Sequence, residues 1–118
     1  MGYLGIELDE LICLLSRGHE AVFSLNGNQY IIQPVQSDSL YGDLVMYQFK
    51  PHLVWLCRIP ISPDHSIDKA PFIRWPVGVS MVEQLLNERC LNGKSFMDRL
   101  LEIHVDEVFE TNLAAAEN

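Results

Sequence analysis

The feature that most constrains this chain is a helix pattern that ends at a glycine and passes directly into a hairpin pattern. Apolar residues recur every three or four positions over residues 7–18, as on the buried face of a surface helix. Gly18 can adopt the left-handed conformation that ends a helix. Apolar and polar residues then alternate across residues 19–33 around Asn26-Gly27, a pair typical of a tight hairpin turn. The sequence therefore predicts an antiparallel sheet preceded by a helix.

The rest of the chain predicts two more strands and two more helices. Residues 44–49 and 52–59 have strand character, and the continuous apolar run at 53–57 favours a central strand that is covered on both faces. Helix patterns follow at 80–90 and from residue 96, where the extent of the helix through residues 105–110 is left open. We therefore expect an α+β fold: an N-terminal helix, a mainly antiparallel sheet of about four strands, and two C-terminal helices packed on the sheet.

Length and composition are typical of one domain, which we expect to span residues 1–112 of the 118. Residues 113–118 look like a vector-derived or disordered tail. No apolar run approaches the roughly 18 residues that a membrane span needs, and the N-terminus lacks the pattern of a secretory signal. Three widely separated cysteines predict neither a disulfide framework nor a metal cluster. The sequence thus predicts a cytoplasmic protein with no membrane association, no metal and no cofactor.

Sixteen acidic residues against eight basic ones give the chain a net charge of −8. Direct binding to a phosphate backbone needs clustered Lys and Arg, and the sequence has no such cluster. We therefore expect no direct contact with nucleic acid. An acidic surface can instead attract a basic protein, although solubility alone is a common reason for acidity.

One set of acids has helical spacing. If the last helix continues to residue 110, four carboxylates form one row at intervals of four residues: Asp98, Glu102, Asp106 and Glu110. Like charges at this spacing destabilise a helix by roughly 0.2–0.5 kcal/mol per pair, so the row does not serve helix stability. It is a candidate docking face for a basic protein partner. The alternatives are an ordinary solvated face, or a strand at residues 105–109, which would separate the four acids.

Three aromatic residues form a second candidate site. Trp55, Phe72 and Trp75 could line a small-ligand pocket beneath the proline-rich segment at residues 60–78. In a domain of this size, the same residues also suit an ordinary core.

Catalytic residues are not indicated. His65 lies between Asp64 and Ser66, and His104 lies three residues before Glu107, so an acid–base role for either histidine is a weaker hypothesis. No nucleophile elbow, phosphate loop or dinucleotide-binding glycine pattern accompanies them. We therefore expect a protein that is not an enzyme.

The helix and hairpin also carry a family resemblance. The residues concerned are Leu8, Leu11, Leu15, Gly18, Glu20, Phe23, Asn26-Gly27 and Tyr30-Ile31-Ile32, with a later Asn92-Gly93-Lys94-Ser95-Phe96. They resemble a group of small uncharacterised α+β proteins associated with Gram-positive bacteria and their mobile elements. The resemblance covers about a third of the chain and implies a fold but no activity.

Together these observations favour a small acidic cytoplasmic protein that regulates a protein partner by stoichiometric binding. Immunity proteins, antitoxins and inhibitors are of this kind. The alternative is a small-ligand-binding domain that uses the aromatic pocket. An unpaired strand at a sheet edge would also allow a homodimer.

Overall fold

The computed structural model describes residues 4–38, 42–61 and 77–110. Its elements are α1 (Leu8–Ser16), β1 (His19–Leu25), β2 (Asn28–Val35), β3 (Asp43–Lys50), β4 (Val54–Pro60), α2 (Val79–Leu86), the 3-10 turn η2 (Met97–Arg99) and β5 (His104–Glu110). The strands form one antiparallel sheet in the order β4-β3-β2-β1-β5. The α+β class is confirmed, with five strands in place of about four. The tail at residues 113–118, like Phe72 and Trp75, lies outside the described residues.

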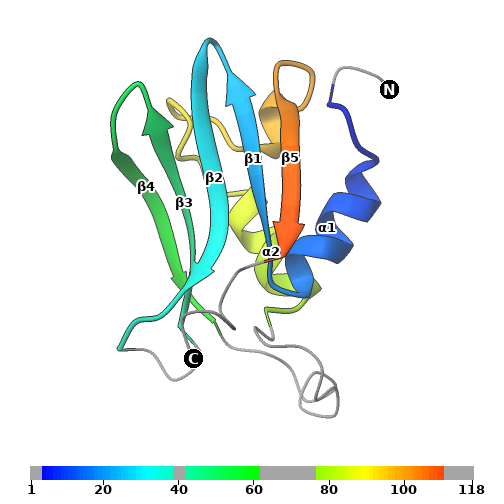
Figure 1. The fold of residues 1–118 in the computed structure, drawn as a ribbon, viewed down its shortest axis with the longest axis vertical. Helices are drawn as coiled ribbons and strands as arrows, with labels where there is room; N and C mark the ends of the chain where they lie inside the picture. Colours follow the sequence, from blue (N-terminus) through cyan, green and yellow to red (C-terminus); the bar gives the residue numbers. More distant parts are fainter. Residues whose placement is uncertain (1–3, 39–41, 62–76, 111–118) are drawn as a thin grey trace.

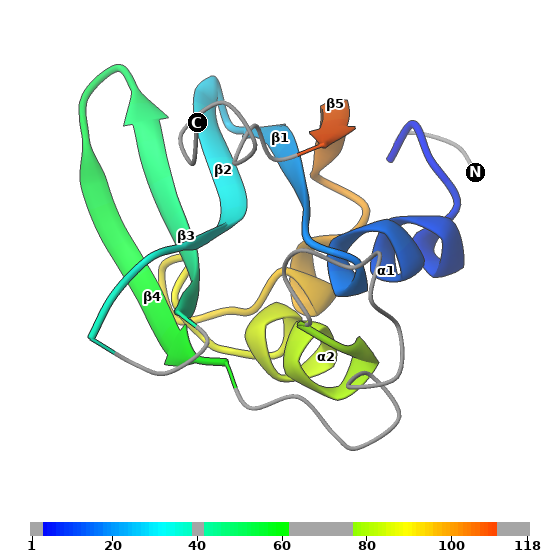
Figure 2. The same ribbon diagram turned by 60° about the horizontal axis from the view of Figure 1, so that its bottom comes forward.

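Both helices cover the same face of the sheet, with α1 packed beside α2 (Figures 1 and 2). The core lies between this helical layer and the sheet. Phe23 and Phe96 are fully buried within it, as are Leu85 and Leu86 of α2. Neither helix in the described part of the chain is long and apolar enough to cross a membrane.

The helix, glycine and hairpin at the start of the chain are confirmed. Leu11 and Leu15 of α1 are fully buried, and the Gly18 N–H donates to the Leu15 carbonyl with its own φ at +91°. The turn between β1 and β2 has positive φ at both Asn26 and Gly27, as a two-residue type I′ hairpin turn requires.

The helix predicted from residue 96 onward is wrong. Only η2 is helical there, and the chain then enters β5, which pairs with β1. The physical reason is the β-branched alternation that begins at Ile103, which strands accommodate better than helices do. Ile103 and Val105 are buried against the core, and β5 pairs with the edge of β1 that β2 does not occupy.

A bulge in β5 explains why its pattern also resembles a helix. The register against β1 shifts by one residue, so that Val22 faces Glu107 while Phe23 faces Val105. Asp106 is the extra residue, and both Asp106 and Glu107 are exposed. Val105 and Val108 can therefore both pack on the core at a spacing of three residues, which imitates a helical period.

The apolar run at residues 53–57 does not form a central strand. Residues 54–57 are the first four of β4, which lies at one edge of the sheet in the described part of the chain. Ile59, near the end of β4, is buried, whereas the beginning of the strand is exposed. The prediction of a central strand is wrong because the first apolar residues of this run are exposed and are not buried on two faces of the sheet.

Candidate functional site

Three consecutive exposed apolar residues lie where β4 begins: Leu53 just before it, and Val54 and Trp55 as its first two residues. Leu53, Val54 and Trp55 follow one another and are 58%, 38% and 52% exposed. We call these three residues the β4 patch. On its outer side β4 pairs with no strand among the described residues, so within them it is an edge strand of the sheet. Adjacent exposed apolar groups on an edge strand are characteristic of a surface that pairs with another chain.

Trp55 is held in place even though half of it is exposed. Its ring lies 4.6 Å from the Tyr47 ring, centroid to centroid, at 45°. On the same side, the Arg58 guanidinium lies 5.4 Å from the Trp55 ring centroid, within the range of a cation–π contact. Arg58 is itself fixed by an ion pair of 2.6 Å between Nη1 and Oδ2 of the buried Asp43. Trp55 is therefore an anchored aromatic side chain, about half of which remains exposed.

Tyr47 supports this arrangement from the neighbouring strand. Its hydroxyl donates to Oε1 of Gln33 at 2.7 Å. Burial, and secondarily the negative charge of Glu20, raises the pKa of Tyr47. The phenol therefore stays protonated at neutral pH and keeps its place as a hydrogen-bond donor beneath Trp55.

Two hollows formed by described residues lie beside β4. One of about 260 Å³ follows the strand along Trp55, Leu56, Cys57 and Arg58. A second of about 210 Å³ lies between the tip of the β1–β2 hairpin and residues 90–92. Typical ligand pockets hold about 300–1,000 Å³, so neither hollow favours the small-ligand hypothesis. Of the three residues predicted to line an aromatic pocket, only Trp55 is described, and it lies on the open edge.

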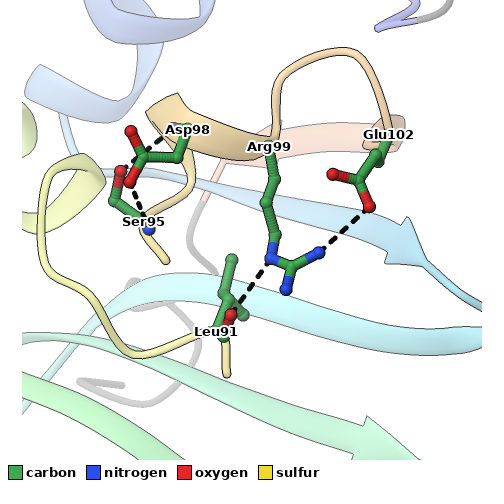
Figure 3. A network of polar contacts seen from close by, with 5 residues as sticks. All are labelled: Leu91, Ser95, Asp98, Arg99 and Glu102. Atoms are coloured by element: carbon green, nitrogen blue, oxygen red, sulfur yellow. Dashed lines mark hydrogen bonds and ion pairs between the residues drawn. The ribbon is translucent and has the colours of Figure 1, made fainter. Parts of the chain in front are cut away.

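Two of the predicted docking acids serve local structure in the segment before β5 (Figure 3). Asp98 and Ser95 form a reciprocal cap: Ser95 N–H donates to Asp98 Oδ2 at 3.1 Å, and Asp98 N–H donates to Ser95 Oγ at 3.0 Å. These bonds lower the pKa of Asp98. Arg99 Nη1 forms an ion pair of 3.0 Å with Glu102, while its Nε donates to the Leu91 carbonyl at 3.0 Å. Both carboxylates therefore help to fold this segment.

The acidic row itself does not exist. Asp98 lies in η2, Glu102 in the turn that follows, and Asp106 and Glu110 in β5. With no helix through these positions, a spacing of four residues no longer places them on one face. The docking face expected from Asp98, Glu102, Asp106 and Glu110 thus loses its geometric basis.

Asp106 instead accepts hydrogen bonds from three strands on the sheet face opposite the helices. Ser24 donates its hydroxyl to Asp106 Oδ2, and Gln29 Nε2 donates to the same oxygen at 3.3 Å. His104 Nδ1 lies 2.8 Å from Asp106 Oδ1. Burial raises the pKa of Asp106, but the bonds from Ser24, His104 and Gln29 outweigh it, so that the pKa lies below its ordinary value. The Asp106 carboxylate therefore connects β1, β2 and β5 through these hydrogen bonds.

The arrangement of Ser24, His104 and Asp106 is not that of a catalytic triad. In a triad the histidine stands between the other two residues, so that it can take the serine proton. Here the Ser24 hydroxyl donates to the carboxylate, which leaves the serine without activation by the imidazole. Sequence reasoning selected His104 but paired it with Glu107, because residues three apart are neighbours on a helix, whereas in the strand His104 meets Asp106 two residues on. His65 lies outside the described residues.

We expect Asp106 to make the stability of the protein depend on pH. A carboxyl group whose pKa is lowered by folding stabilises the folded state above its unfolded pKa of about 3.9, and this contribution is lost as the pH falls through the folded pKa. Asp106→Asn should therefore lower the urea midpoint at pH 5–7, and its difference from wild type should shrink below about pH 4. Glu107→Gln, at the exposed neighbouring position, is the control. A constant difference down to pH 2 would contradict this role.

Comparisons with protein-family models, with curated proteins and with solved structures found no match to this chain. Within the described ranges, no three His, Cys, Asp or Glu side chains come together as a metal site. Any functional assignment therefore depends on the geometry of the chain itself, in which the β4 patch is the most distinctive surface.

Proposed function

We propose that this chain is a small acidic cytoplasmic protein that regulates a protein partner by stoichiometric binding, without catalysis, and that the partner binds along β4. The observation that carries the proposal is the run of three exposed apolar residues on an edge strand. An immunity protein, an antitoxin or an inhibitor would act in this way. The acidic row is replaced as the docking surface by the β4 patch.

The occupant that suits this edge is an extended segment of the partner, added as a sixth strand. Strand addition would satisfy the outward-facing backbone groups of β4, while alternate side chains of the partner contact Trp55. Lys50 is an exposed cation shortly before the β4 patch, whereas Arg58 beyond the patch is already paired with Asp43. We therefore expect the partner segment to be apolar with an acidic residue at its margin, in contrast to the basic partner that the acidic row suggested.

The test compares capture of the partner by two variants of the tagged chain. Trp55→Ser removes the aromatic anchor, whereas Leu101→Ser changes a residue that is 92% exposed outside β4 and serves as a matched control. Loss of a central aromatic contact typically weakens binding by about 30-fold or more. We expect proteins that are recovered with wild type and with Leu101→Ser to be lost with Trp55→Ser, while circular dichroism shows that both variants are folded.

Two results would count against the proposal. One is equal recovery of every partner with Trp55→Ser. The other is a dimer of this chain that light scattering detects and Trp55→Ser dissociates, since β4 would then serve self-association.

A further inference from the structure

Three sulfur atoms meet where β4 passes the segment that follows α2. Met46 and Cys57 face each other on β3 and β4, and such opposed residues have Cβ atoms about 5 Å apart. Cys90 approaches from the segment after α2: its thiol donates to Met46 Sδ at 3.7 Å, and it lies close enough to the Cys57 thiol for the two groups to shift each other's pKa. Met46 is fully buried, whereas both cysteines are partly exposed. Two partly exposed cysteines therefore converge on one buried methionine.

The interaction between the thiols gives them different acidities. It raises the pKa of Cys57, which burial raises further. It lowers the pKa of Cys90, and this effect exceeds the opposing effect of burial. Cys90 is therefore the thiol that ionises first. Because the thiolate is the reactive form of cysteine, Cys90 is the nucleophile of the pair and Cys57 is in position to attack it in turn.

We propose that Cys57 and Cys90 form a redox-reactive dithiol, which a peroxide converts into an intramolecular disulfide. The new bond would join β4 to the segment after α2 and close a covalent ring around residues 58–89. This site is independent of the proposed partner and requires no residue of the β4 patch.

The reaction proceeds in two balanced steps. The Cys90 thiolate attacks one peroxide oxygen, the O–O bond breaks, and Cys90 becomes a sulfenic acid while the released hydroxide takes up a proton to give water. Cys57 sulfur then attacks the Cys90 sulfur, the S–S bond forms and the S–O bond breaks. The departing hydroxide takes the Cys57 proton and leaves as a second water. Two thiols are thereby oxidised by two electrons, and one peroxide is reduced.

Mass spectrometry of the full chain tests this proposal directly. The reduced protein, freed of reductant, is treated with a small excess of hydrogen peroxide, alkylated with N-ethylmaleimide and digested with trypsin. Cys13, Cys57 and Cys90 fall in separate tryptic peptides, residues 1–17, 18–58 and 90–94, because trypsin does not cleave between Lys50 and Pro51. We expect peptide 18–58 joined to peptide 90–94, with Cys13 alkylated. Cross-linking should also raise the Tm of the oxidised protein by roughly 5–10 °C.

Cysteine variants provide the controls. Cys13→Ser should oxidise like wild type, since Cys13 lies exposed on α1, whereas Cys57→Ser and Cys90→Ser should each lose the linked peptides. A disulfide that includes Cys13, a dimer linked between chains, or full alkylation of Cys57 and Cys90 in wild type after peroxide treatment would overturn the proposal. The wild-type result alone decides the matter if a variant fails to fold.

Discussion

Phe23→Ala is expected to destabilise the protein by about 3–5 kcal/mol, a large fraction of the roughly 5–15 kcal/mol that stabilises a domain of this kind. Phe23 is fully buried on β1. Its ring stacks on Tyr30 with centroids 5.0 Å apart and meets the edge of Phe96 at 5.1 Å and 88°. The substitution therefore removes contacts with both the hairpin and the segment before β5, and leaves a cavity between them.

Urea unfolding followed by circular dichroism measures this loss. Phe109→Ala is the matched control, because Phe109 is 36% exposed on β5 and its truncation should cost less than about 1 kcal/mol. Similar losses for the two variants would show that the Phe23 cluster does not organise the core.

The N-terminal half of this fold could be predicted because its signals are local. The end of α1 depends on Gly18, and the register of the first hairpin depends on Asn26-Gly27. Each feature is specified by the conformational range of one or two residues, so that no knowledge of distant neighbours is needed.

The C-terminal half could not be predicted in the same way, because two local signals there lead to different structures. The cap formed by Ser95 and Asp98 is present, as its spacing indicates, but the helical turn that it begins ends at Arg99. From Ile103 onward the chain is a strand because the edge of β1 offers a partner, and β1 lies some 80 residues earlier in the sequence. A tertiary contact thus overrides a local helix signal.

The position of Trp55 at an exposed sheet edge could not be predicted, for a related reason. A continuous apolar run can be a strand buried on both faces or an edge strand awaiting a partner, and its composition does not distinguish these two cases. The order of strands in the sheet decides between them, and that order depends on where β5 pairs. Because β5 pairs with β1, the remaining outer strand is β4, and Trp55 lies at an edge of the sheet.

The other edge of the sheet is covered in part by the N-terminal residues, and Gly5 makes this possible. The Val105 N–H donates to the Leu4 carbonyl at 2.8 Å, which brings the chain against the outer side of β5. Gly5 has φ of +88°, and a Cβ added there would lie 2.9 Å from His104 Nε2 and 3.2 Å from the Val105 carbonyl oxygen. Any side chain at Gly5 would therefore disturb the covering of β5.

We expect Gly5→Ala to destabilise the protein by about 2–4 kcal/mol, measured by urea unfolding. Roughly 1–2 kcal/mol of this is the cost of a left-handed conformation, and the rest reflects contact with His104 and the Val105 backbone. Gly27→Ala isolates the first contribution, because Gly27 has φ of +83° with no atom within 4 Å of an added Cβ. Gly5→Ala should cost less in a His104→Ala background than in wild type, because the nearest contact of the added Cβ is then absent. Equal losses at the two glycines would contradict a close covering of β5, and the sheet would then have two edges able to bind a partner.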